Sequence, residues 1–393
     1  MKHFSSSDIK KYLIIILLSI IFTLYFFETY LILFNKNKNY FATLEQKAIY
    51  YKSKTGKEYD TRSKLEIYKD LKQKESQISV SVPPFMFIGK KTKVLPFSGV
   101  SNIKTINCNE NGYYSILKSD RYGFNNPDKE WDKKKIEFIF VGDSFVYGDC
   151  VNRPNDLSSV VRNLSNTAVI NLGQKGNGPL IMYATLREYL IKGAKNIVWV
   201  FYENDITNLS MELTSSRLNN YLKDENFKQN LVNNQNSINE IVLSNISNMF
   251  EEGERAEKNL IKNEKIKYKI LKFIRLDKTK DVIKKSFNND EFLYKKFEEI
   301  LIKSKDLALK NDSKLYFVYI PKYQLGKRKY NKKMFKKILK ITSDFNIPLI
   351  DIYEIVLKQE KNSKNLYPFE KQGHFNIEGY KKVAKAIFNI ISK

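Results

Sequence analysis

Two side chains suited to acyl transfer stand far apart in this sequence, Ser144 in "FIFVGDSFVYGDC" and His374 in "KQGHFNIEGY". A serine hydroxyl is a poor nucleophile until a neighbouring base takes its proton, and histidine has an unperturbed pKa suited to that task near neutral pH. The chain has 2 histidines, and the other one, His3, precedes a long apolar stretch. If the protein uses a catalytic histidine, His374 is therefore the candidate.

Other polar residues follow apolar runs in the way that Ser144 does. The tetrahedral intermediate of acyl transfer carries an oxyanion that needs hydrogen-bond donors. We expect these donors to be the backbone amides of Ser144 and Gly176 and the carboxamide of Asn204, with Asp143 and Asp205 in supporting positions. Each feature alone also fits a helix cap, a turn or a tight connection. Their order and spacing together favour a catalytic site.

Short apolar runs separated by helical patterns must position these residues. The runs lie at 136–141, 168–172, 196–201, 314–320 and 347–352. Near-continuous apolar strands alternating with helices predict an α/β fold with a parallel sheet covered on both faces. Ligands bind at the carboxyl ends of such strands, so the Ser, Gly, Asn and His segments should converge there. A polar segment at about 209–289 predicts a helical insertion that either shapes a substrate cleft or is a solvated decoration.

The arrangement resembles the SGNH or GDSL hydrolases, which are named for blocks containing Ser, Gly, Asn and His. The matching segments are "GDSF", "NLGQKGNGP", "YENDI" and "GHFNIEGY", and the resemblance covers about 136–393. It implies a flavodoxin-like three-layer sandwich with a mainly parallel five-stranded sheet in the order 2-1-3-4-5. It also implies serine esterase or acyl-transfer chemistry, and "SDRYGFNNPD" resembles the lead-in of membrane-anchored, extracytoplasmic members.

Two positions depart from this family pattern. Tyr202 stands where the family usually has glycine, and Lys371 and Gln372 stand where it places an aspartate before the histidine. An orienting carboxylate fixes the histidine tautomer and stabilises the imidazolium. Three alternatives follow: Gln372 or a backbone carbonyl holds the ring in a Ser/His dyad, Glu370 takes the place of the acid, or the enzyme is slow or has lost activity.

The stretch Tyr12 to Phe34 is apolar, with Glu28 as its one charge. As a helix it would be about 34 Å long, enough to cross a hydrocarbon core of about 30 Å. A cleaved signal peptide has a shorter apolar region that ends in small residues, but no alanine or glycine precedes Ala42. We therefore expect an uncleaved anchor with the bulk of the chain outside the cytoplasm. Glu28 either contacts a partner within the membrane or lies near the outer interface.

These features predict five parts along the chain. A cytoplasmic tail at 1–11 precedes the transmembrane anchor at 12–34, and a juxtamembrane stalk with an extended segment follows at 35–95. A loop-rich lead-in at 96–135, rich in turn-forming residues, then packs on the hydrolase-like domain at 136–393.

The 2 cysteines are Cys108 and Cys150. In an exported domain an even pair suggests a disulfide, and the alternative is two buried free thiols. Two cysteines and two histidines do not make a zinc site of the usual kind, and we expect no metal and no cofactor.

The chain carries 68 Lys and Arg against 43 Asp and Glu, a net charge of +25. The lysines are scattered without a dense arginine block or an RNA-binding motif, so we expect no nucleic-acid partner. The leading hypothesis is a membrane-anchored serine esterase, periplasmic or at the cell surface, acting on an O-acetyl or other O-acyl ester of an envelope carbohydrate. The alternatives are an O-acetyltransferase using the same site, or an inactive glycan-binding or assembly protein with envelope glycan-assembly partners.

Overall fold

The structure is a computed structural model, and it describes residues 6–34, 44–75, 77–259, 270–280, 282, 290–322, 332–370 and 373–393. The chain divides into two compact units, one of Met1–Ala42 and Met249–Asp290, the other of Thr43–Asn248 and Glu291–Lys393. The strands are β1 (Ile78–Val80), β2 (Lys104–Ile106), β3 (Ile116–Lys118), β4 (Phe138–Val141), β5 (Val169–Asn171), β6 (Asn196–Tyr202), β7 (Lys314–Ile320) and β8 (Leu349–Asp351). The α-helices are α1 (Ser6–Phe34), α2 (Leu44–Thr55), α3 (Lys64–Lys74), α4 (Ser144–Tyr147), α5 (Leu157–Ser165), α6 (Pro179–Tyr189), α7 (Asp205–Glu212), α8 (Ser216–Lys223), α9 (Gln235–Asn259), α12 (Asp290–Leu309), α13 (Lys332–Asp344), α14 (Ile352–Ile355) and α15 (Ile377–Ile391). Short 3-10 helices are η1 (Pro84–Phe87), η2 (Asp128–Asp132), η3 (Leu231–Asn234), η4 (Leu357–Gln359), η5 (Ser363–Leu366) and η6 (Pro368–Glu370).

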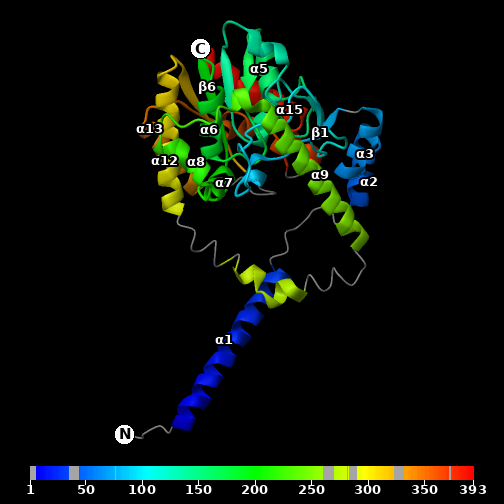
Figure 1. The fold of residues 1–393 in the computed structure, drawn as a ribbon, viewed down its shortest axis with the longest axis vertical. Coiled ribbons are helices and arrows are strands. Elements are labelled where there is room, and N and C mark those ends of the chain that lie inside the picture. The colour runs from blue at the N-terminus through cyan, green and yellow to red at the C-terminus, as the bar shows by residue number, and fades with distance from the viewer. Residues whose placement is uncertain are drawn as a thin grey trace. The chain divides into compact units, whose positions relative to one another are not determined.

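The larger unit is built on a five-stranded parallel sheet in the order β5-β4-β6-β7-β8, whose middle strand, β6, is labelled in Figure 1. Numbered within the sheet, this order is 2-1-3-4-5, so the predicted flavodoxin-like topology is confirmed. The order reverses at β4, whose neighbours are β5 and β6. In open α/β sheets such a reversal opens a crevice at the carboxyl ends of the strands, and here it lies at the end of the strand that leads into Ser144.

Both faces of this sheet are buried, as its near-continuous apolar strands require. Val198 and Val200 of β6 belong to the hydrophobic cluster that also contains residues of α5 and α15. The alternate residue Phe201 packs on the other face against Phe297 of α12, with 5.4 Å between ring centroids. The sheet is thus the middle of three layers, and burial on both sides fixes the positions where its strands end.

The segment before the sheet differs from the expected stalk. The capping box of Ser63 and Glu66 starts α3, and the helices α2 and α3 bury aromatic and aliphatic side chains, among them Tyr51, Ile67 and Tyr68. Beyond them, β1, β2 and β3 form a second small sheet in which β1 and β2 are parallel and β2 and β3 antiparallel. The described residues from Leu44 to Asn248 therefore belong to the same compact unit as the main sheet.

The described part of the polar insertion is largely helical, and its first part packs on the larger unit. Leu218 and Tyr221 of α8, Leu231 of η3 and Ile238 of α9 are all buried in the larger unit. The boundary between the two units falls within α9, between Asn248 and Met249. The described residues at 270–280 and 282 belong to the smaller unit.

The smaller unit contains α1. Within it the stretch Lys10–Phe34 is long and apolar enough to cross a membrane, and few of its residues are buried. This agrees with the prediction of a membrane-spanning helix by length and composition.

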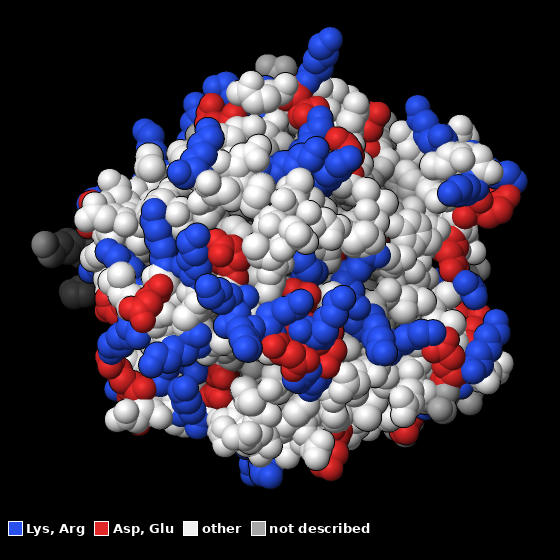
Figure 2. Space-filling model, turned by 90° about the horizontal axis from the view of Figure 1, so that it is seen from above, with Lys and Arg blue, Asp and Glu red and all other residues white. Residues whose placement is uncertain are grey.

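Basic side chains are distributed over the surface rather than collected in one block. Figure 2 shows Lys and Arg spread across one face with Asp and Glu among them. On this face the basic residues that contribute to the net charge of +25 do not form a single dense patch.

Candidate active site

Ser144 lies where β4 ends and α4 begins. Asp143 caps the helix, because its side chain accepts a hydrogen bond from the backbone N–H of Phe145 at 2.9 Å. The Ser144 Oγ atom lies 2.8 Å from His374 Nε2. His374 is in the loop before α15, whose first turn is capped by Asn376, and its ring packs against Phe145 with 5.1 Å between centroids. Two segments 230 residues apart therefore meet at hydrogen-bonding distance.

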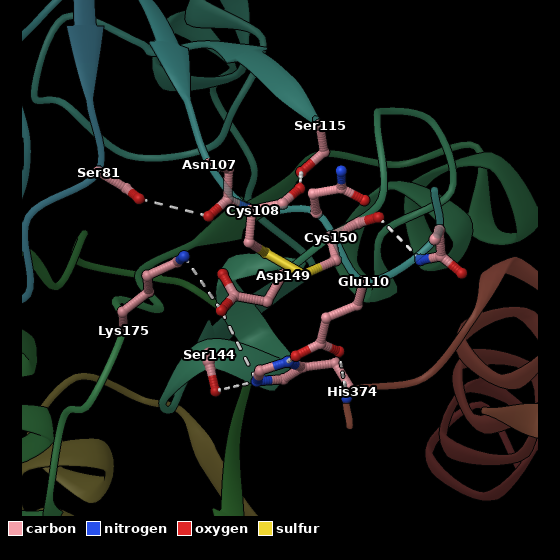
Figure 3. The surroundings of a disulfide bond; sticks show 12 residues. Ser81, Asn107, Cys108, Glu110, Ser115, Ser144, Asp149, Cys150, Lys175 and His374 are labelled. Carbon is pink, nitrogen blue, oxygen red and sulfur yellow. Dashed lines mark hydrogen bonds and ion pairs between the residues drawn. A yellow bond between two sulfur atoms is a disulfide. The ribbon is translucent and has the colours of Figure 1, made fainter. Parts of the chain in front are cut away.

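The other ring nitrogen of His374 is held by a carboxylate that the sequence analysis did not name. Glu110 Oε1 lies 3.1 Å from His374 Nδ1, and Glu110 Oε2 accepts the backbone N–H of His374 at 2.8 Å (Figure 3). When Nδ1 carries the proton and donates to Glu110, Nε2 is free to accept the Ser144 proton. The three residues thus have the geometry of a nucleophile, a base and an orienting acid.

The loop that carries Glu110 is held on both sides. Cys108, two residues earlier, is joined by a disulfide to Cys150 in the loop after α4. Asn111 Nδ2 donates to the Cys150 carbonyl at 2.9 Å, and Asn109 Nδ2 donates to the Asp60 carbonyl at 2.7 Å. The Cys150 sulfur lies near Glu110 and His374 but is committed to the disulfide, so this trio does not make a metal site.

The charges around His374 favour its protonated form. Burial alone would lower its pKa, but the carboxylates of Asp149, Glu110 and Asp143 outweigh that effect and raise the pKa of His374 to about 9. For Glu110, burial works to raise the pKa, and the hydrogen bonds and charge of His374 bring it below its ordinary value. Burial raises the pKa of Asp143 to about 6. The site therefore stabilises the imidazolium that forms when Ser144 gives up its proton.

Asp149 is the second residue that sequence reasoning missed. Its Oδ2 lies 3.6 Å from His374 Nε2 and 3.3 Å from Lys175 Nζ, so it sits between an imidazole and an ammonium (Figure 3). Its Oδ1 is buried and has no hydrogen-bond partner among the residues that the structure describes. Lys64 of α3 is near the same pair. Burial, together with the charge of Lys175, lowers the pKa of Lys64 to about 8, although the charge of Asp149 opposes this shift. A carboxylate thus lies near each nitrogen of the imidazole, Glu110 near Nδ1 and Asp149 near Nε2.

The residues expected to bind the oxyanion follow strands on either side of β4. Gly176 lies in the loop after β5, and Asn204 directly follows β6. Gly176 has a φ of +67°, and a Cβ there would come within 2.6 Å of the Phe85 ring, so the turn requires glycine. Asn204 Oδ1 is buried without a hydrogen-bond partner among the described residues. Both residues therefore lie at the sheet edge that carries Ser144.

The remaining predicted residues have structural surroundings. Asp205 is fully buried and accepts the backbone N–H of Tyr202 at 2.9 Å, and burial raises its pKa well above the ordinary value. Glu370 is exposed, with a φ of +57°. Lys371 and Gln372 lie outside the described residues. The three alternatives for the orienting group had not included Glu110, which is the carboxylate in contact with the His374 ring.

A signal for Glu110 was present in the sequence. It follows Cys108 by two positions, and Cys150 follows Ser144 by six. A disulfide between the two cysteines must bring the Glu110 loop close to the nucleophile, whatever the rest of the fold. A search for the missing acid near both cysteines would therefore have found Glu110 and Asp149.

A cavity of about 560 Å³ lies beside the loops that carry Glu110 and His374. Aromatic rings form much of its wall, and amide and charged side chains complete it. Its lining includes Tyr50, Tyr51, Tyr113, Asn111, Phe369 and Glu370. The Phe369 ring packs edge-on against Tyr50 and Tyr51, with centroids 6.1 and 5.4 Å away.

No family model and no curated protein matches this chain. Among solved structures, it is similar to a lipolytic protein of the G-D-S-L family from Desulfitobacterium hafniense, at 12% identity and a TM-score of 0.36, over 66% of this chain and 99% of that one. It is similar to a member of the lipolytic G-D-S-L family from Veillonella parvula at 12% identity and a TM-score of 0.37, with the same coverage. By its sheet topology and its four sequence blocks in order, the chain has the fold of the SGNH/GDSL hydrolases.

Proposed function

We propose that this protein is a serine ester hydrolase whose catalytic residues are Ser144, His374 and Glu110. The observation that carries the proposal is one chain of contacts, in which Ser144 Oγ lies 2.8 Å from His374 Nε2 and His374 Nδ1 lies 3.1 Å from Glu110. A protein that retained the fold only for binding would have no need to keep these three side chains within hydrogen-bonding distance of one another. The contacts therefore favour the enzyme over the inactive binding protein.

In this mechanism Ser144 Oγ attacks the acyl carbon of an ester while His374 Nε2 takes its proton. Glu110 holds Nδ1–H and stabilises the imidazolium. The backbone amides of Ser144 and Gly176 and the carboxamide of Asn204 bind the oxyanion. His374 then protonates the leaving alcohol, and the serine ester that remains is cleaved by water in the reverse sequence of proton transfers. A sugar hydroxyl in place of that water would make the protein an acyltransferase.

The proposed substrate is an O-acyl, most simply O-acetyl, ester on a carbohydrate of the cell envelope. The cavity beside the Glu110 and His374 loops supports this, because its aromatic rings offer apolar faces to a sugar ring and the Asn111 carboxamide oxygen offers an acceptor to its hydroxyls. An acetyl group needs little space at Ser144, so a separate cavity for the rest of the substrate is consistent with a small acyl group on a larger glycan.

We further propose that α1 anchors the enzyme in a membrane with the sheet-bearing unit outside the cytoplasm. The apolar length of α1 supports the anchor. The disulfide between Cys108 and Cys150 supports an oxidising compartment, because such bonds are rare in the cytosol.

The test is hydrolysis of p-nitrophenyl acetate by the full-length protein in detergent, with Ser144→Ala as the inactive variant. Ser343→Ala, which changes an exposed serine on α13, is the matched control. We expect Ser144→Ala to lose the enzyme-dependent rate and to escape labelling by a fluorophosphonate probe, while Ser343→Ala retains both. Equal rates and equal labelling for the wild-type protein and Ser144→Ala would contradict the proposed function.

A further inference from the structure

The single acidic residue of the apolar stretch, Glu28, is not available to a partner protein. Its carboxylate is 1% exposed and accepts the backbone N–H groups of Lys278 and Thr279 at 3.0 and 2.7 Å and the Thr279 hydroxyl at 2.7 Å. One turn earlier, the Tyr25 hydroxyl donates to the Ile274 carbonyl at 3.1 Å. A segment some 250 residues further along the chain is therefore bound to α1 through specific polar contacts.

These contacts lie toward one end of the apolar stretch. Glu28 is about 24 Å along the helix from Tyr12 and about 9 Å from Phe34, at roughly 1.5 Å per residue. If α1 crosses a hydrocarbon core of about 30 Å, Glu28 lies in the outer third of that core, within about 10 Å of the headgroups. The helical residues at 270–274 and 277–280 lie beside this end of α1 within the smaller unit (Figure 1).

The exposed side chains of this segment are both apolar and basic. Ile270, Leu271 and Ile274 are 52%, 39% and 54% exposed, which is costly for aliphatic side chains in water. Next to them in "ILKFIRLDKTK" are Lys272, Arg275, Lys278 and Lys280, with Asp277 as the one acidic residue. Apolar side chains flanked by basic ones are typical of segments that lie in a membrane interface.

We propose that residues 270–280 form a membrane-interfacial foot that lies on the bilayer beside α1, with an anionic lipid surface as its partner. Ile270, Leu271 and Ile274 enter the boundary between headgroups and acyl chains, where the exposed side of α1 is already in contact with lipid. The basic side chains pair with lipid phosphates. Glu28 fixes the foot to the anchor through its hydrogen bonds to Lys278 and Thr279. The same bonds stabilise the carboxylate at this depth, where an unpaired polar group would be costly. The membrane is thus contacted at two places in the sequence, at α1 and again at 270–280.

The proposal rests on α1 as a membrane anchor but not on the esterase activity, so its test uses fluorescence. Full-length Ile274→Trp protein is reconstituted into phosphatidylcholine vesicles with and without phosphatidylglycerol, using lipids brominated near the headgroup end of the acyl chain. We expect brominated lipid to quench a larger fraction of the emission of Ile274→Trp than of the native chain, whose tryptophans are Trp131 and Trp199. The loss should be greater with phosphatidylglycerol present.

Two further variants separate the steps of the argument. Ile20→Trp, in the middle of α1, reports whether the anchor is inserted and should be quenched by lipids brominated deep in the acyl chain. Ile274→Trp combined with Glu28→Ala should lose much of its quenching, because the foot is no longer fixed to the anchor. An unquenched Ile274→Trp beside a quenched Ile20→Trp would overturn the proposal, as would an unquenched Ile20→Trp. Quenching that is indifferent to Glu28→Ala would overturn the role of Glu28.

Discussion

Asp149→Asn should move the activity of this enzyme toward lower pH. At a pKa of about 9, His374 is mostly protonated at neutral pH, and an imidazolium cannot accept the Ser144 proton. Asp149 stabilises that cation from 3.6 Å, and asparagine keeps its shape without its charge. Removing the charge lowers the pKa of His374, so a larger fraction of the enzyme holds the neutral base at pH 7.

The size of the effect follows from the distances. Two unit charges 3.6 Å apart attract by about 4 to 5 kcal/mol at an effective dielectric constant of about 20, equivalent to ~3 pKa units. This is an upper limit, because the Lys175 ammonium lies 3.3 Å from the same carboxylate oxygen and offsets much of its charge. We expect the pKa of His374 to fall by at least about one unit, which corresponds to roughly a tenfold gain in kcat/KM at pH 7.

The assay is the pH dependence of kcat/KM for p-nitrophenyl acetate, whose acid limb reports the base of the free enzyme. The wild-type limb should lie near pH 9 and the Asp149→Asn limb at least one unit lower, with Asp344→Asn on α13 as an exposed control. The raised pKa of His374 affects stability in the opposite direction from activity: it lowers activity at neutral pH but stabilises the folded state there. The raised pKa stabilises the fold fully below pH 6.5, and this contribution is lost as the pH rises through about 9. Superimposed limbs for wild type and Asp149→Asn would refute the electrostatic reasoning.

Three further predictions concern the orienting acid, the disulfide and the oxyanion. Glu110→Gln should lower kcat by roughly 10⁴-fold, as an amide in place of the triad acid does elsewhere, while Glu370→Ala should have little effect; the reverse ranking would exclude Glu110 as the orienting acid. Replacing Cys108 and Cys150 by serine should lower the free energy of unfolding by about 4 kcal/mol, measured by denaturant titration, and also reduce kcat, because the Glu110 loop is no longer fixed to the nucleophile loop. Asn204→Ala should lower kcat by about 10²- to 10³-fold with KM nearly unchanged, and a change confined to KM would assign Asn204 to substrate binding instead.

The sheet could be predicted because each strand is a short apolar run with a polar residue at its carboxyl end. Burial on both faces demands such runs, so β4, β6 and β7 are visible in the sequence without any long-range information. The same regularity placed Ser144 and His374 at one edge of the sheet. Their separation of 2.8 Å then depends only on the loop before α15 reaching that edge.

Glu110 could not be predicted in this way, because its position depends on contacts between distant residues. No period or cap marks the segment "NCNENGY", and its conformation is set by a disulfide to Cys150 and a hydrogen bond to Asp60. The helices α2 and α3 were interpreted as a stalk for a related reason. Their polar composition describes the exposed side, whereas the buried Tyr51 and Tyr68 are few and widely spaced.

The disulfide between Cys108 and Cys150 makes the proposed activity depend on whether the two thiols have been oxidised. The carboxylate that orients the imidazole is carried by a loop preceding the sheet, and its covalent tie to the nucleophile loop exists only after two thiols have been oxidised. Under the proposed function, a chain whose two thiols are still reduced lacks this tie, so we expect its activity to be lower until the bond has formed. Protein made in a reducing host should accordingly show the lower kcat predicted above for the variant with serine at positions 108 and 150.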